Sequence, residues 1–132
     1  MSKLLRTVIA LGAAALMGLS PVAAFAETSL GVYQTTDRKM DYELSRCGGG
    51  AQLCVKLLAA RGTALTKQTR PYVGKFIVNK AKPGGKNKWN GRITIQGYTL
   101  DGSLKLRPGR DFVMHGCAYV VICSDFTLIP AK

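Results

Sequence analysis

Short stretches in which apolar and polar residues alternate recur along the chain from residue 30 onward. Tyr42 and Leu44 share one face of such a stretch, and Leu53, Val55 and Leu57 share one face of the next. A period of two is typical of β-strands that have one face in the core and one in water. Further strands are expected at 30–36, 73–79, 89–99 and 121–129, with two short strands on either side of Pro108-Gly109.

Turn-forming residues separate these stretches at close intervals, and no long amphipathic helix interrupts them. The pattern predicts an all-β protein, a single antiparallel up-and-down barrel of about eight strands. A β-sandwich is the structural alternative, but nearly every junction is short enough for an up-and-down path. The exception is the polar segment 61–71, which we expect to be a loop with one helical turn.

The stretch 89–99 is the longest predicted strand. Its alternation predicts that Trp89, Ile93 and Ile95 point inward, whereas Arg92, Thr94 and Gln96 point outward. Gly91 and Gly97 within it predict a bend or a bulge. The dipeptide Asp101-Gly102 is then expected to turn the chain.

Four cysteines occur as two close pairs, Cys47 with Cys54 and Cys117 with Cys123. Three connectivities are possible, and local pairing is expected because it agrees with the apolar pattern of both hairpins. A metal site is the alternative interpretation. The cysteine spacings differ from those of zinc sites and the chain has a single histidine, so no metal and no cofactor are expected.

Each disulfide implies a strand register. With Cys47 opposite Cys54, Leu44 would face Leu57 and Tyr42 would face Ala59, across a turn made by the glycines 48–50. The second disulfide sets the register of the last hairpin. With Cys117 opposite Cys123, we expect Met114 to face Phe126, Phe112 to face Leu128 and His115 to face Asp125. A three-residue loop at 108–110 likewise sets Arg107 opposite Asp111.

Residues 1–26 have the features of a secretory signal peptide. Lys3 and Arg6 precede an apolar segment, and Ala24-Phe25-Ala26 is an A-x-A cleavage site. The apolar run is shorter than the roughly 20 residues of a membrane span. We therefore expect a periplasmic or secreted domain of residues 27–132, without a transmembrane span, released by cleavage near Ala26.

The chain carries a formal net charge of +12, and cleavage of the leader would lower it by two. Five basic residues surround Trp89 near one predicted turn: Lys80, Lys82, Lys86, Lys88 and Arg92. They predict binding of an anionic envelope component such as lipopolysaccharide, anionic lipid or an acidic protein. The export signal argues against nucleic acid, and an ordinary solvated loop is the alternative.

No catalytic constellation is visible in the sequence, so we expect a protein that is not an enzyme. His115 is the only histidine, and the predicted register gives it Asp125 as an ion-pair partner. Ser124 would point to the opposite face of its strand, away from this pair. No glycine-rich nucleotide motif is present.

An eight-stranded barrel is just wide enough to hold one small ligand or to be filled by its own side chains. A small apolar ligand would contact the inward-facing residues Tyr33, Tyr42, Leu44, Trp89, Ile93, Phe112 and Met114. A filled core made of the same residues is the alternative, and it is favoured. Inhibition of a basic enzyme is disfavoured because both partners would carry positive charge.

Short motifs occur in a characteristic order, namely Gly31-Val32-Tyr33, Cys47 with Leu53-Cys54, Trp89-Asn90-Gly91, Asp101-Gly102 and Gly116-Cys117 with Cys123. In these motifs the chain resembles a family of small exported bacterial proteins of unknown function with a lipocalin-like barrel. The resemblance covers essentially all of residues 27–132. It implies a lipocalin-like fold and an exported location, and it implies no established activity.

Overall fold

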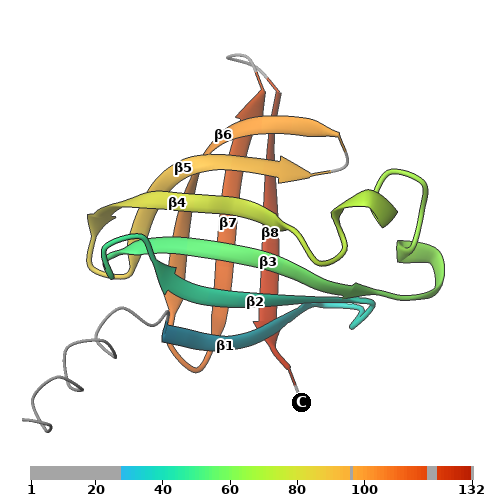
Figure 1. The fold of residues 1–132 in the computed structure, drawn as a ribbon, viewed down its shortest axis with the longest axis horizontal. Coiled ribbons are helices and arrows are strands. Elements are labelled where there is room, and N and C mark those ends of the chain that lie inside the picture. The colour runs from blue at the N-terminus through green and yellow to red at the C-terminus, as the bar shows by residue number, and fades with distance from the viewer. Residues whose placement is uncertain (1–27, 96, 119–121, 132) are drawn as a thin grey trace, which may run out of the picture.

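The computed structural model describes residues 28–95, 97–118 and 122–131 (Figure 1). The predicted leader 1–26 therefore lies outside the described residues, as does Gln96. The strands are β1 (Thr28–Thr35), β2 (Met40–Cys47), β3 (Gln52–Ala60), β4 (Phe76–Gly85), β5 (Lys88–Ile95), β6 (Tyr98–Arg107), β7 (Asp111–Ala118) and β8 (Ile122–Pro130). Each pairs antiparallel with the next, and β1 pairs with β8 to close the barrel. The predicted up-and-down barrel is confirmed.

Both predicted registers in the C-terminal half are confirmed. Cys117 lies opposite Cys123, and His115 lies opposite Asp125. Across the preceding turn, Arg107 lies opposite Asp111, and its Nε donates to Asp111 Oδ1 at 2.7 Å. The short loops leave little freedom in how these strands pair, so the apolar alternation sufficed to align them.

The first hairpin has the predicted disulfide but a different register. Cys47 and Cys54 are bonded, yet Cys47 lies opposite Gln52, so the bridge joins diagonal positions 6.0 Å apart at Cα. Consequently Leu44 faces Val55 rather than Leu57, and Tyr42 faces Leu57 rather than Ala59. A shift of two residues keeps every side chain on its face, which is why the apolar pattern did not reveal it.

The predicted strand 89–99 is in fact two strands. Ile95 pairs with Tyr98, and Gly97 between them has a φ of 86°, a backbone conformation that suits glycine. Asp101-Gly102 is accordingly inside β6 and does not turn the chain. Likewise β4 continues through Gly85, so most of the predicted basic turn is strand.

Three glycines lie opposite one another on the adjacent strands β5, β6 and β7. The bulge that was predicted at Gly91 is absent from the pairing of these strands. Gly91 lies opposite Gly102, which lies opposite Gly116, with no register shift between them. A Cβ atom on Gly102 would come within 2.6 Å of both the His115 carbonyl oxygen and Ile93 Cδ1. Gly102 therefore makes room for the buried Ile93 side chain, and Gly91 allows the close approach of Ala81 in β4, where a Cβ would lie 2.9 Å from the Ala81 Cβ.

The two ends of the barrel differ. At one end the turns β2–β3, β4–β5 and β6–β7 are tight, and the Trp89 indole donates to the Ala51 carbonyl at 3.0 Å. At the other end, β3 and β4 are joined by the long linker 61–75, which lies at the right of Figure 1. We call these the closed end and the open end. Large side chains that are at most 2% exposed fill the interior, among them Phe112, Leu44, Leu53, Ile93 and Leu104.

The linker is held against the barrel by its own hydrogen bonds. It contains two 3-10 turns, η3 (Gly62–Ala64) and η4 (Arg70–Tyr72), where one helical turn was expected. Thr69 is 4% exposed, and its hydroxyl bonds with the Ala64 carbonyl at 2.6 Å and the Thr66 amide at 2.8 Å. The Gly74 amide donates to the Leu57 carbonyl at 2.7 Å. The linker is therefore an ordered cover beside the open end.

Candidate functional site

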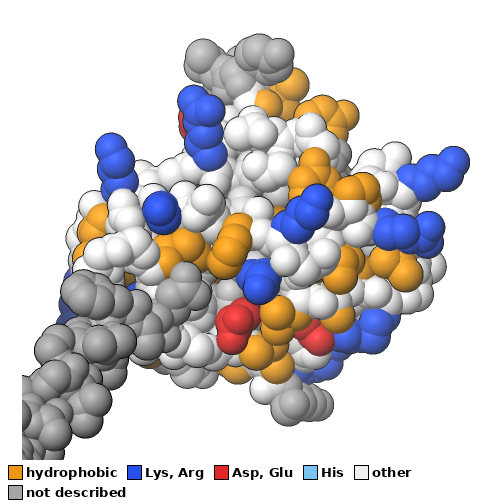
Figure 2. Space-filling model, viewed as in Figure 1, with side chains coloured by type: hydrophobic (Ala, Val, Ile, Leu, Met, Phe, Trp, Pro, Cys, Tyr) orange, Lys and Arg blue, Asp and Glu red, His pale blue; other side chains and the backbone are white. Residues whose placement is uncertain are grey.

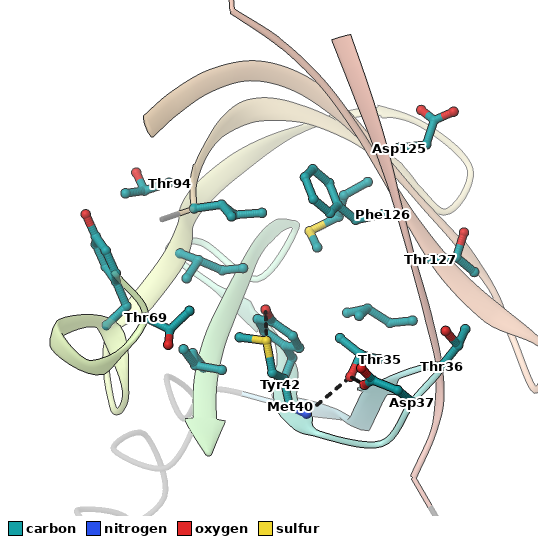
Figure 3. Close-up of a pocket in the computed structure, with 16 residues that line it drawn as sticks. Thr35, Thr36, Asp37, Met40, Tyr42, Thr69, Thr94, Asp125, Phe126 and Thr127 are labelled. Atoms are coloured by element: carbon teal, nitrogen blue, oxygen red, sulfur yellow. Dashed lines mark hydrogen bonds between the residues drawn. The ribbon is translucent and has the colours of Figure 1, made fainter. Parts of the chain in front are cut away.

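A pocket of about 290 Å³ lies inside the barrel at the open end (Figure 3). Its inner part is lined by Tyr42, Leu57, Ile77, Met114 and Leu128, all of them buried. Its outer part is lined by Thr35, Thr36, Asp37, Met40, Thr69, Tyr72, Thr94, Ile95, Asp125, Phe126 and Thr127. The pocket thus has an apolar floor and a rim rich in hydroxyl groups, as small-molecule sites commonly do.

Only two of the seven predicted cavity residues, Tyr42 and Met114, line this pocket. The other five, Tyr33, Leu44, Trp89, Ile93 and Phe112, lie in the packed core, so their assignment to the cavity is corrected. The interior is consequently divided. Its closed half is filled by side chains, as the alternative interpretation held, and the open half is hollow.

The Tyr42 hydroxyl is a polar group of the pocket that belongs to a buried side chain. Tyr42 is 5% exposed, and burial raises the pKa of its phenol to about 12. Its hydroxyl lies 3.8 Å from the Met40 sulfur, which is a weak hydrogen-bond acceptor (Figure 3). Burying a hydroxyl without a good partner is unfavourable, so this group is ready to bind a polar atom of a ligand.

Asp37 places a carboxylate at the rim. The Thr35 hydroxyl donates to it at 2.7 Å and the Lys39 amide at 3.0 Å. The Thr35 hydrogen bond, followed by that of the Lys39 backbone, lowers the pKa of Asp37 below its ordinary value. The rim next to the β1–β2 turn therefore stays negatively charged at neutral pH.

The pocket also reaches sideways between β4 and β5. These strands pair near the closed end, where Lys82 lies opposite Asn90 and Pro83 opposite Trp89. From Gly91 onward the described residues of β5 have no register partner in β4. Thr94 and Ile95, which alternation places on opposite faces of β5, both line the pocket at this end of the strand.

The predicted basic residues do not line the pocket. Lys80, Lys82, Lys86, Lys88 and Arg92 are all exposed and lie on β4, β5 and the turn between them. Lys105 of β6 joins them, because it lies directly opposite Lys88. Arg92 lies 3.7 Å from Asp101, an exposed ion pair. Figure 2 shows Lys and Arg side chains scattered over the visible face, with few acidic side chains among them.

His115 and Asp125 form the predicted pair on the outer face of the barrel, where His115 Nδ1 contacts Asp125 Oδ1. Ser124 lies opposite Gly116, so it alternates to the other face, as expected. Cys117 and Cys123 are bonded to each other, and the described residues contain no free cysteine.

Sequence reasoning missed most of the pocket lining. Met40, Ile77 and Ile95 lie near the open ends of their strands and Phe126 lies in the middle of β8, and for all four the pattern indicated only core positions. The length of segment 61–71 is a signal only for the linker part of the lining, because the β1–β2 and β5–β6 connections at the same end of the barrel are short.

No family model, curated protein or solved structure matches this chain. Among the residues that the structure describes, no helix combines the length and the apolar character that a membrane span requires. The site must therefore be interpreted from its own chemistry.

Proposed function

We propose that this protein is a non-enzymatic binder of a small, largely apolar ligand that enters the open end of the barrel. The observation that carries the proposal is the pocket of about 290 Å³, which has buried apolar side chains below and hydroxyl groups above. This volume is at the lower end of the range of about 300–1,000 Å³ that is usual for ligand pockets. The ligand is accordingly small.

The polar groups of the pocket narrow the ligand class. Its apolar part would lie against Leu57, Ile77 and Met114, whose burial makes the floor a poor site for water. One polar atom would reach the Tyr42 hydroxyl, which lacks a strong partner. Met40 and Met114 have flexible thioether side chains that adapt to ligands of different shape. The pocket therefore suits an apolar body that carries one hydrogen-bonding group.

The test is equilibrium binding of N-phenyl-1-naphthylamine, an uncharged fluorescent probe with one N–H group. We expect saturable binding of one probe per chain, with NMR shift changes around Met114 and Phe126 and none around Trp89. Ile95→Trp would place a large ring at the rim and should abolish binding without unfolding the barrel, because Ile95 is only half-buried. Absence of saturable binding by the wild type would refute the proposal.

A matched pair of tyrosine variants tests the role of the pocket hydroxyl. Tyr42→Phe removes a hydroxyl that lines the pocket, whereas Tyr33→Phe removes one from a buried tyrosine outside it. Loss of one hydrogen bond should weaken probe binding about 3- to 10-fold in the first variant only. Equal affinities in both variants would show that the bound probe does not use Tyr42.

We also propose that the protein is exported and belongs with the lipocalin-like family that it resembles. The eight-stranded barrel, open at one end, supports membership of this family, because such barrels can hold one small ligand. Two disulfides support export, because they persist in oxidising compartments. The mass of the protein secreted by its host tests export: a chain that starts at Glu27 supports it, and one that starts at Met1 contradicts it.

Binding of an anionic envelope component is a second candidate function. Lys88 and Lys105 lie directly opposite each other on the outer face, although like charges in such pairs destabilise a sheet. We call the exposed residues Lys80, Lys82, Lys86, Lys88, Arg92 and Lys105 the basic face. Asp101, beside Arg92, is the only acidic residue that the described residues place in an ion pair with this face. A negatively charged surface would relieve the repulsion.

Two triple variants with the same change in net charge test this candidate. The first replaces Lys82, Lys86 and Lys88 by Gln, and the control replaces Lys67, Arg70 and Lys75, which are exposed on the linker. At low salt, we expect the wild type and the control variant to bind to anionic vesicles. The first variant should not bind to them. Binding should also weaken as the Debye length falls from about 10 Å at 0.1 M salt to about 3 Å at 1 M. Equal binding of both variants would refute a specific basic face.

A further inference from the structure

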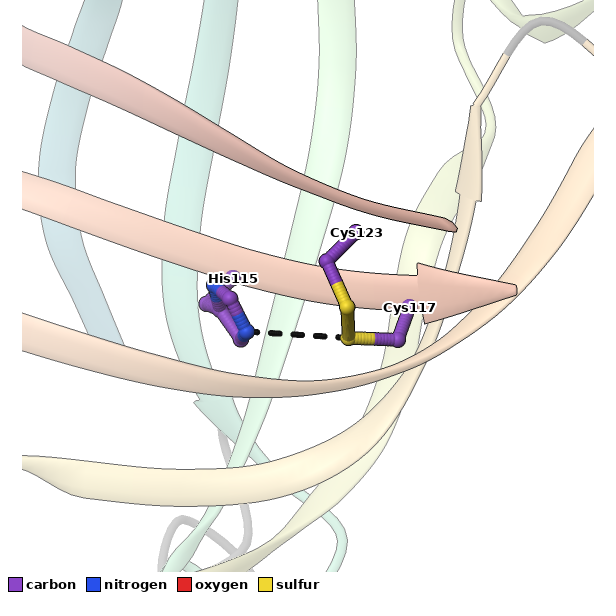
Figure 4. A group of neighbouring side chains, drawn as sticks. All are labelled: His115, Cys117 and Cys123. Atoms are coloured by element: carbon purple, nitrogen blue, oxygen red, sulfur yellow. Dashed lines mark hydrogen bonds between the residues drawn. A yellow bond between two sulfur atoms is a disulfide. The ribbon is translucent and has the colours of Figure 1, made fainter. Parts of the chain in front are cut away.

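Two neighbouring positions of the β7–β8 ladder carry four side chains of the kinds that bind metals. His115 lies opposite Asp125, and Cys117 lies opposite Cys123 two residues further along. All four side chains are on the outer face of the barrel, away from the proposed ligand pocket's floor, and Figure 4 shows the imidazole turned toward the disulfide. The cluster therefore lies outside the apolar floor, and its Asp125 also lines the outer part of the pocket.

One pair of donor atoms has the spacing of a tetrahedral metal site, while the two sulfurs are bonded to each other and must move apart after reduction. His115 Nε2 lies 3.6 Å from Cys117 Sγ, and the three donor atoms of His115, Cys117 and Cys123 lie within 4.8 Å of one another. In a tetrahedral zinc site, Zn–S bonds of about 2.3 Å and Zn–N bonds of about 2.0–2.1 Å separate nitrogen from sulfur by about 3.5 Å. The nitrogen and the first sulfur already have this separation.

Asp125 holds the imidazole in the orientation that a metal ligand needs. It contacts His115 Nδ1, which leaves Nε2 directed at the Cys117 sulfur. Metal-binding histidines commonly donate their second N–H to a carboxylate in this way, which fixes the ring and strengthens the ligand. The carboxylate is thus a positioning group rather than a fourth ligand.

The disulfide decides whether the site can bind a metal, because thiolates and not disulfides are metal ligands. Cys123 is exposed and Cys117 half-buried, so a reductant can reach this bridge. Cys47 and Cys54 close a loop of similar length but are 4% and 2% exposed, and the Lys80 amide covers the Cys54 sulfur at 3.3 Å. Exposed disulfides are the more readily reduced ones, so the buried Cys47–Cys54 bridge is an internal control.

We propose that His115, Cys117 and Cys123 form a redox-gated site for a thiophilic metal cation of the Zn²⁺ class. An external dithiol opens the Cys117–Cys123 bond: it gives two electrons and two protons to the sulfurs and leaves as its own disulfide. Binding of Zn²⁺ to the two sulfurs then releases the two thiol protons. Three protein ligands leave the fourth tetrahedral position open for water or for a group on another molecule.

The experiment begins with selective reduction of the intact protein by a phosphine reductant, followed by alkylation and peptide mapping. We expect alkylation at Cys117 and Cys123 while Cys47 and Cys54 remain bonded. Zn²⁺ is then titrated into the reduced, unalkylated protein, and Co²⁺ is used as a spectroscopic probe. One equivalent of metal per chain and thiolate-to-cobalt charge-transfer absorption are the expected results. The oxidised protein should take up no metal at this site.

Three variants separate the roles of the residues. Cys117→Ser combined with Cys123→Ser should abolish uptake and the charge-transfer band, while circular dichroism confirms that the barrel remains folded. Asp125→Asn should lower Zn²⁺ affinity about 10- to 100-fold, the usual effect of losing such a carboxylate. His115→Ala should lower it further, because one of three ligands is lost.

Three results would overturn the proposal. The first is equal metal uptake by the oxidised and reduced proteins, and the second is uptake by the reduced protein that survives the double serine variant. The third is reduction of the Cys47–Cys54 bridge before the Cys117–Cys123 bridge, since the gate would then not lie at the exposed cluster.

Discussion

The closed and open halves of this barrel are built from the same eight strands but are filled differently. In the closed half, Leu44, Leu53 and Phe112 are fully buried against one another, and the Trp89 indole ties β5 to the β2–β3 turn. In the open half, Phe126 and Ile95 are only partly buried, and hydroxyl groups surround an empty volume of about 290 Å³.

This difference shows how a small barrel can combine stability with an internal pocket. Each large side chain buried in the closed half contributes about 1.5–3 kcal/mol through apolar burial. Side chains that border a hollow lack contacts on one side and contribute less. A pocket confined to the open half therefore leaves most of the stabilising core intact. The predictions below test this division, beginning with the largest expected effect.

Truncation of a phenylalanine in each half should have unequal effects. Phe112→Ala removes a fully buried ring that packs 6.4 Å, centroid to centroid, from Tyr33, and it should cost about 3–5 kcal/mol. Phe126→Ala enlarges an existing hollow and should cost less than about 2 kcal/mol. Urea unfolding of both variants measures the free energies. Equal losses would mean that the two halves are equally well packed.

The pH dependence of stability reports whether the hollow is dry. Burial raises the pKa of Tyr42 to about 12, whereas the unfolded tyrosine ionises near pH 10. Between these values the unfolded chain releases a proton that the folded protein keeps, so stability should fall as the pH rises. The loss attributable to Tyr42 should reach roughly 2–3 kcal/mol by pH 12, at about 1.4 kcal/mol per pKa unit.

Urea unfolding of the wild type and of Tyr42→Phe between pH 8 and pH 12 measures this contribution. The variant should lose less stability over the range, because phenylalanine cannot ionise. If both proteins follow the same profile, Tyr42 is solvated in the folded state. The open half would then be a water-filled funnel rather than a shielded pocket.

A substitution in the row of glycines on β5, β6 and β7 should have the smallest effect on stability, and a glycine in a turn provides a matched control. Gly102→Ala places a Cβ 2.6 Å from the His115 carbonyl oxygen, and backbone atoms cannot move aside cheaply. We expect a cost of about 1–3 kcal/mol. Gly49→Ala, in the β2–β3 turn, meets no atom within 4 Å and should stay within about 0.5 kcal/mol of the wild type. Thermal unfolding of the two variants distinguishes them, and similar melting temperatures would contradict the crowding argument.

The pairing from the end of β6 through β8 was predictable from the sequence because its information is local. Arg107 and Asp111 flank a three-residue loop, and the cysteine pair fixes the last hairpin, so alternation left one register. The first hairpin shows the limit of this reasoning. A disulfide can join diagonal as well as directly opposite positions, and both choices keep the same residues inside.

Other errors have a similar physical origin. Glycine serves turns and close contacts equally well, so nothing in the sequence distinguished the turn at Gly97 from the crowded strand position at Gly102. The pocket could not be predicted because its walls come from distant segments. Thr69 and Tyr72 of the linker meet Ile95 and Phe126 only after the barrel closes.

The seam between β1 and β8 has a consequence for the order in which the chain folds. Every other strand contact of the described barrel joins sequence neighbours, which can form as hairpins in microseconds. At the seam, Thr35 pairs with Leu128 and Tyr33 with Pro130, so closure must bring together the two ends of the domain. Because loop-closure entropy opposes such long-range contacts, a curled open sheet should form first, and seam closure should be the slow step that completes the hollow.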